Sequence, residues 1–109
     1  MANTFKLKTK ANVGVTTVGI YTAPASTTTV VIGITLANTS GSGVNVGVGI
    51  TRAGTTEDVK LLKNAPIPQG SSLEFMGGNK VVLEDTDTVT VDSDTNNSID
   101  AALTIMEIT

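Results

Sequence analysis

The chain has 109 residues and a net charge of -3, and it contains neither cysteine nor histidine. This length suits one domain with one core, and the missing residue types exclude disulfides, thiol catalysis and the commonest general base and metal ligand. The acidic balance predicts no nucleic-acid partner, and no segment approaches the roughly 20 apolar residues of a membrane span.

Residues 1–11 are predicted to form an N-terminal arm or edge strand, ahead of a single β-sandwich domain over residues 12–109. The segment alternates two apolar residues with three lysines, Phe5 and Leu7 with Lys6, Lys8 and Lys10. As an edge strand it would keep its lysines in solvent, where they discourage pairing with other chains. Alternatively, the lysines form a basic strip that binds an acidic neighbouring subunit.

Three segments of the first half, residues 13–21, 27–37 and 44–52, are predicted strands. Within 27–37, one face is expected to carry Val30, Ile32, Ile34 and Leu36. Within 44–52, Gly47 and Gly49 lie on the face opposite the valines. Because glycine weakens a strand, this pair indicates close packing against another layer or subunit, or else a poor but harmless outer face.

The stretch over residues 66–91 is predicted to form three short strands with two turns. Pro68 and Gly70 favour a tight turn that leads into a strand over residues 72–76. Gly77-Gly78-Asn79 predicts a hairpin connection to a return strand over residues 80–84. An acidic turn at Asp85-Thr86-Asp87 then precedes a strand around Val89 and Val91.

The last predicted strand, residues 98–109, is apolar on both faces near its end. One face carries Leu103 and Ile105, and the other carries Met106 and Ile108. A strand of this kind normally lies between layers or in an interface. The short run over residues 59–63 fits a strand or one helical turn, and a strand is favoured.

Many short apolar strands between turn-rich connections predict an all-β, antiparallel β-sandwich. A jelly-roll-like arrangement is the favoured closure, with an immunoglobulin-like sandwich as the alternative. The predicted core residues are Ile32, Ile34, Val46, Val48, Leu73, Phe75, Leu83, Val89 and Leu103.

No motif for catalysis, cofactor binding or metal binding is present in the sequence. Asp92-Ser93-Asp94 begins like an EF-hand loop, but Asn97 stands where glycine is needed and Leu103 where a bidentate glutamate is needed. A solvated acidic turn is therefore predicted, with a loose calcium site within residues 85–96 as the alternative. Without histidine to activate a serine, the protein is predicted not to be an enzyme.

The second half of the chain resembles small virion structural proteins of tailed bacteriophages. In those proteins a P-x-G-S-x-L turn precedes a K-x-V-L-E…D-x-V-x-V hairpin and a closing strand, which matches residues 68–73, 80–84 and 87–91. Ala23-Pro24-Ala25, which leads into residues 28–36, is also similar to the family. The resemblance covers most of the chain after about residue 12, and it departs at Asp85-Thr86-Asp87, where a glycine commonly precedes the second aspartate.

The resemblance implies a head decoration (cement) protein on the capsid surface of the virion, with a tail or fibre-associated module as the alternative. It implies the major capsid protein or other virion proteins as partners. It also implies a homo-oligomer, with a trimer favoured because decoration in such families commonly sits on local three-fold positions. The candidate partner-binding residues are Phe5, Lys6, Leu7, Lys8, Lys10, Gly47, Gly49, Met106 and Ile108.

Overall fold

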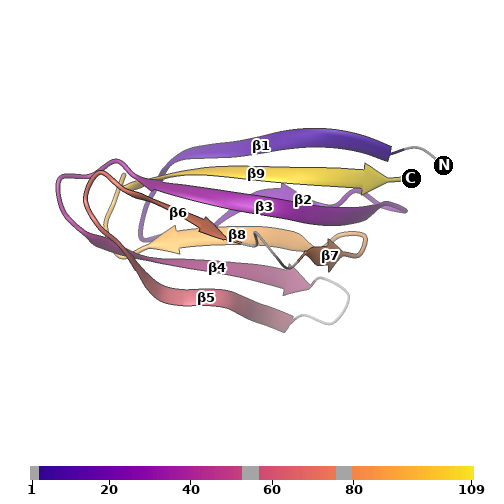
Figure 1. Ribbon diagram of the computed structural model, residues 1–109. Coiled ribbons are helices and arrows are strands. Elements are labelled where there is room, and N and C mark those ends of the chain that lie inside the picture. The colour runs from indigo at the N-terminus through magenta and orange to yellow at the C-terminus, as the bar shows by residue number, and fades with distance from the viewer. Residues whose placement is uncertain (1–2, 53–56, 76–79) are drawn as a thin grey trace.

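The computed structural model describes residues 3–52, 57–75 and 80–109, except for the side chain of Phe75. Two antiparallel sheets pack face to face, and the described residues contain strands but no helix (Figure 1). No helix in this part of the chain could therefore cross a membrane.

The strands follow one another with short connections. In chain order they are β1 (Asn3–Val13), β2 (Val18–Thr22), β3 (Thr28–Asn38), β4 (Val44–Arg52), β5 (Glu57–Ile67), β6 (Ser72–Phe75), β7 (Val81–Leu83), β8 (Thr88–Ser93) and β9 (Ile99–Ile108). The expected strand over residues 13–21 is split, because the chain leaves one sheet after Val13 and enters the other at Val18.

Sheet A has the strand order β1-β9-β3-β6, with β7 also paired to β3, and sheet B has the order β2-β8-β4-β5. β6 and β7 pair with successive parts of β3, Leu73 opposite Leu36 and Leu83 opposite Thr29. Taken as two halves of one interrupted strand, they complete two four-stranded sheets with the order of a jelly roll. The predicted β-sandwich is confirmed.

The expected hairpin between residues 72–76 and 80–84 is wrong. Gly77-Gly78-Asn79 lies outside the described residues, but the strands on either side of it do not pair with each other. Both run antiparallel to β3, so they run in the same direction. The physical reason is that β3, with 11 residues, offers an edge long enough to pair with both segments.

A bulge in β3 changes which side chains face the core. Its register against β9 shifts between Val31 and Gly33, so an extra residue is accommodated at Ile32. Val31 and Ile34 are therefore both buried, and Ile32 is only half-buried, contrary to the predicted alternation. The bulge corrects the prediction for Ile32.

The other predicted core residues mostly lie where expected. Those that are buried are Ile34, Val46, Val48, Leu83, Val89 and Leu103. Leu73 is half-buried and packs against the core, and the side chain of Phe75 lies outside the described part of the chain. The predicted turn before β6 is also present, since the Ser71 amide donates to the Pro68 carbonyl at 3.1 Å and Gly70 has a φ of 73°.

β1 is an integral edge strand of sheet A. It pairs with β9 from Asn3 to Val13, in continuous register as far as Lys10. The predicted strand over residues 59–63 is also confirmed, as the middle of β5, the edge strand of sheet B.

Candidate functional site

The outer face of sheet A carries apolar side chains that the sandwich itself does not cover. Four of them lie in register across four strands, and we call them the apolar row: Phe5 of β1, Met106 of β9, Val30 of β3 and Val82 of β7. Phe5 is 69% exposed and Val82 58% exposed, whereas Met106 and Val30 are half-buried. Cross-strand neighbours stand side by side, so the row is continuous.

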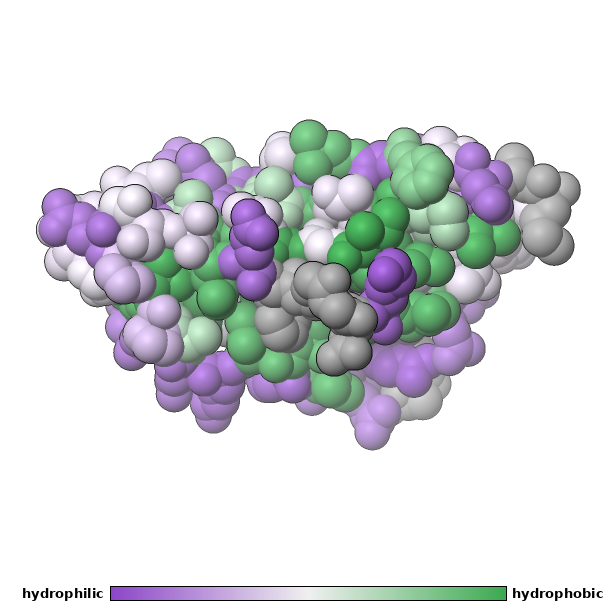
Figure 2. Space-filling view, in the orientation of Figure 1, coloured by the Kyte–Doolittle hydropathy of each residue, from purple (hydrophilic) through white to green (hydrophobic). Residues whose placement is uncertain are grey.

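Further apolar side chains extend the row along the strands. Leu7, two residues after Phe5, is 65% exposed, and Ile108, two residues after Met106, is half-buried. Figure 2 shows hydrophobic side chains gathered where β1, β9, β3 and β7 run side by side. Four of the candidate partner-binding residues thus lie together on one face, because the register with β9 places Phe5 and Leu7 on the Met106 side of the sheet.

The lysines of β1 lie on the opposite side of the strand. Lys6 is in register with Ile105 and Lys8 with Leu103, both of which point into the core. The two lysines therefore point toward the side of sheet B, and the Lys6 ammonium reaches Glu107 at 2.9 Å. Lys10 is exposed. Since Lys6 has a partner in its own chain, a basic strip for an acidic neighbour would depend on Lys8 and Lys10.

Glu107 is the centre of a buried polar network between the two sheets. The Tyr21 hydroxyl of sheet B donates to Glu107 at 2.6 Å and also lies 2.8 Å from the Thr29 hydroxyl. The Tyr21 hydrogen bond and the Lys6 ion pair lower the pKa of the Glu107 carboxyl, against the opposing effect of its burial. Burial and the hydrogen bond to Glu107 raise the pKa of Tyr21 to about 12. The network ties β1, β9 and β3 to β2.

This network predicts an acid-sensitive contribution to stability. Because the pKa of Glu107 is lowered on folding, its contribution is complete above the unfolded value of about 4.3 and is lost as the pH falls through the folded value. We expect the free energy of unfolding of the wild type to exceed that of Glu107→Gln at neutral pH and the two to converge in acid. Urea titrations from pH 7 to pH 2 measure the difference, and a difference independent of pH would contradict this role.

Gly47 and Gly49 are buried by their own chain. A Cβ on Gly47 would lie 2.6 Å from an Asp92 carboxylate oxygen, and one on Gly49 would lie 2.9 Å from the carbonyl oxygen of Val59 in β5. The predicted close packing is present, but the atoms that approach the two glycines belong to β5 and β8, the neighbours of β4 in the same sheet. These two glycines therefore form no part of an exposed partner surface.

Gly49→Ala is expected to lower the free energy of unfolding by about 1–3 kcal/mol, because the added methyl group would displace the backbone of β5. Gly41→Ala is the matched control, since its Cβ would have nothing within 4 Å. Chemical denaturation of both variants measures the effect. Equal free energies of unfolding for the two variants would show that β5 can move to accommodate the methyl group without loss of stability.

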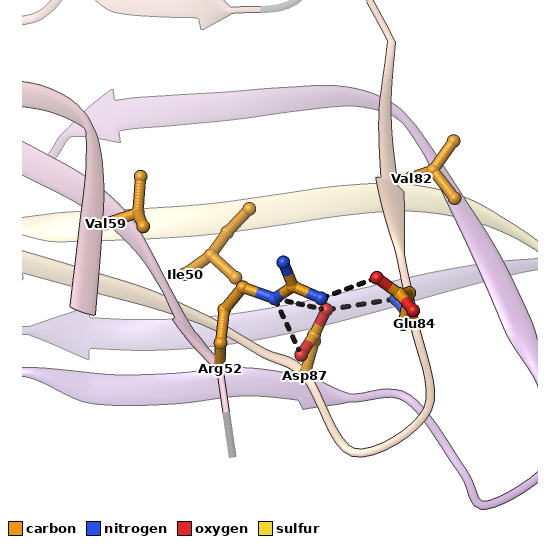
Figure 3. Close-up of a pocket in the computed structure, with 6 residues that line it drawn as sticks. All are labelled: Ile50, Arg52, Val59, Val82, Glu84 and Asp87. Atoms are coloured by element: carbon orange, nitrogen blue, oxygen red, sulfur yellow. Dashed lines mark hydrogen bonds and ion pairs between the residues drawn. The ribbon is translucent and has the colours of Figure 1, made fainter. Parts of the chain in front are cut away.

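A second polar cluster joins the sheets at the opposite, β5–β7 side of the sandwich. Arg52 of β4 contacts Glu84 at 2.6 Å and Asp87 at 3.3 Å, and these hydrogen bonds raise its pKa. The three side chains form one end of a pocket of about 230 Å³, whose apolar walls include Ile50 and Val59 (Figure 3). Because Arg52 is already held by two carboxylates, this pocket offers no free cation to an anionic ligand.

In the acidic segment over residues 85–96, where a loose calcium site is the alternative prediction, the carboxylates of Asp92 and Asp94 bind different partners. Asp92 accepts a hydrogen bond from the Thr17 hydroxyl at 2.8 Å, and Asp94 accepts one from the Asn45 amide at 3.1 Å. Within the described residues, no three acidic side chains converge on a possible metal position.

Sequence reasoning missed Val30 and Val82 as members of the exposed face. The alternation predicts that Val30 faces the core together with Ile34. Because of the bulge at Ile32, Val30 instead points to the outer face of sheet A. Val82 shares this side because it is the register partner of Val30. The alternation of Val81, Val82 and Leu83 could not by itself indicate which strand β7 would join.

No protein-family model matches the sequence, and no curated protein matches it. Among solved structures, a chain described under the heading "Bacillus endospore appendages form a novel family of disulfide-linked pili" is similar in fold. The alignment covers 99% of this chain and 87% of that chain, with a TM-score of 0.59 and 16% sequence identity. At this identity, the likeness shows a shared β-sandwich fold.

Proposed function

We propose that this protein is a non-enzymatic structural protein of a tailed-phage virion, a head decoration protein that stabilises the capsid surface. The observation that carries the proposal is the exposed apolar row on the outer face of sheet A. A soluble monomer rarely exposes a contiguous apolar patch of this kind, and such patches commonly mark sites of protein association. The assignment to a virion, with the major capsid protein as partner, rests on the sequence resemblance.

A multi-copy role suits the chemistry of this surface. Each copy is small, so the contact of one copy with the particle would be weak on its own. When many copies bind neighbouring positions on one particle, each contact raises the effective concentration for the next, and the shell gains stability as a whole. The polar clusters at Glu107 and Arg52 have a different role, since they hold the two sheets together.

The number of copies per particle tests the proposal. Quantitative mass spectrometry of purified particles is expected to find the protein in a number comparable to that of the major capsid protein. A number far below that would favour the tail or a fibre, and absence from the particles would contradict a virion role.

A second candidate function is that of a fibre subunit. It is favoured by the fold likeness to the chain from the Bacillus endospore appendages, and it includes the tail or fibre-associated role. Those pili are disulfide-linked, whereas this chain has no cysteine, so its copies could not be joined in that way. Electron microscopy of the purified protein tests this candidate, because a fibre subunit should form filaments and a decoration protein should not.

A further inference from the structure

The outer face of sheet A differs in shape between its two ends. The apolar row lies at one end. Four residues farther along β1 is a row of small side chains in register, Thr9, Ala102 and Thr35. Midway between the two rows, Leu7 is opposite Thr104. The row of small side chains continues to the exposed Glu74 of β6, which is opposite Thr35, and the exposed Asp100 lies nearby, opposite Ala37. The face is therefore bulky and apolar at one end, and at the other it is flat over β1, β9 and β3, with two carboxylates beside the small side chains.

The flat end contains two shallow hollows. The larger, of about 330 Å³, is lined mainly by Thr9, Ala11, Ala37 and Ala102, together with Lys10, Thr35, Asp100 and Ala101. The second, of about 210 Å³, lies beside it and is lined in part by Gly33, Thr35 and Thr104. Both hollows open on the same side of the sheet as the apolar row.

We propose that a second copy of this chain covers this face, with a twofold axis that lies between the two faces. The axis runs across the strands at the level of Leu7 and Thr104. Rotation about it reverses the strand direction, so Phe5 of one copy faces Thr9 of the other, and Met106 faces Ala102. Each apolar row then fills the hollows of the opposite copy, and every contact occurs twice.

Other symmetries fit the face less well. A twofold axis parallel to the strands would place one apolar row against the other and leave the hollows empty, at the cost of the lost van der Waals contacts. A threefold ring joins two different surfaces that point in different directions. Here the bulky end and the hollows lie on one face, so the shape favours a pair over the trimer that the sequence resemblance implies.

The area of the face is sufficient for a specific contact. Ten residues of β3 span about 30 Å, and four strands span about 19 Å, so each copy offers about 570 Å². The total of about 1,100 Å² exceeds the roughly 1,000 Å² expected of a specific interface. Phe5 and Leu7, both about two-thirds exposed, would supply the apolar anchors along the β1 edge of the face.

This pairing deepens the proposed structural role, because it names the partner of the apolar row. It makes the dimer the unit that binds the particle. The dimer would present two copies of every remaining surface in opposite directions along the strands, which doubles the attachment points of each unit.

Sedimentation velocity of the purified protein tests the pairing. We expect the wild type to sediment as a dimer of the 11.1 kDa chain. Phe5→Asp, which charges the row, and Thr9→Trp, which fills the hollow, should each raise the dimer dissociation constant by about 30-fold or more. Val15→Asp is the matched control, since Val15 is 56% exposed but lies outside this face. It should leave the dimer unchanged.

Single-cysteine variants test the axis, because the chain has no cysteine of its own. A short bismaleimide should cross-link Thr104→Cys to itself. It should not cross-link Phe5→Cys to itself, but it should cross-link a mixture of Phe5→Cys and Thr9→Cys. A wild-type monomer at micromolar concentration, a trimer, or a dimer indifferent to both Phe5→Asp and Thr9→Trp would overturn the pairing.

The two proposals fail in different ways. A monomer in solution that is abundant on particles would overturn the pairing and leave the structural role intact. A stable dimer that is absent from particles would have the reverse consequence.

Discussion

Leu103→Ala is expected to lower the free energy of unfolding by about 3–5 kcal/mol, because the side chain it truncates lies at the centre of the core. Leu103 is completely buried in β9, between Lys8 of β1 and Ile34 of β3. Its truncation removes apolar contact and leaves a cavity that neighbours on two sides cannot fill, because the backbone ladders hold them in place. Urea denaturation, with an unchanged slope of free energy on urea concentration, measures the loss.

Leu7→Ala is the matched control for this experiment. It removes the same atoms from the neighbouring strand, but Leu7 is 65% exposed, so the expected loss is below about 1 kcal/mol. The control is measured at a protein concentration at which the chain is monomeric. Comparable losses at the two positions would contradict the assigned faces of sheet A.

Asp87→Ala is expected to cost about 2–3 kcal/mol, because it leaves a backbone donor without its acceptor. The Asp87 carboxylate is buried, accepts a hydrogen bond from the Glu84 amide at 3.0 Å and contacts Arg52. These contacts form the turn in which the chain passes from sheet A to sheet B. Thermal and urea denaturation of the variant measure the cost.

Two further variants separate the causes. Asp87→Asn keeps an oxygen for the Glu84 amide but removes the charge that faces Arg52, so its loss should be intermediate. Asp85→Ala removes an exposed carboxylate from the same turn and should change stability by less than about 0.5 kcal/mol. Equal effects of Asp85→Ala and Asp87→Ala would show that net charge, and not the buried contacts, governs the turn.

Most of the fold could be predicted from the sequence because alternation is a local signal. In β9 the inward Leu103 and Ile105 and the outward Met106 and Ile108 follow the pattern residue by residue. The bulge at Ile32 could not be predicted in this way, because it depends on the register that β9 imposes. The mistaken hairpin before residues 80–84 has the same origin, since pairing partners far apart in sequence leave no trace in a local pattern.

The candidate surface was predictable in part. The two terminal strands carry more apolar side chains than the core of one small sandwich can bury. This excess identifies four residues of the surface in the sequence: Phe5, Leu7, Met106 and Ile108. Gly47 and Gly49 are buried by neighbouring strands of their own chain, and a glycine-rich strand face does not reveal in the sequence which chain will bury it. The Lys6–Glu107 pair joins segments about a hundred residues apart, beyond the reach of sequence spacing.

The position of β9 has a consequence for synthesis. Among the strands of the described residues, it is the last to leave the ribosome, yet it lies between β1 and β3 in sheet A. Until it emerges, β1 has no neighbour in its sheet, and β3 presents a bare edge with its apolar side chains in water. Such intermediates are prone to aggregate. Sheet A can therefore be completed only after β9 has emerged.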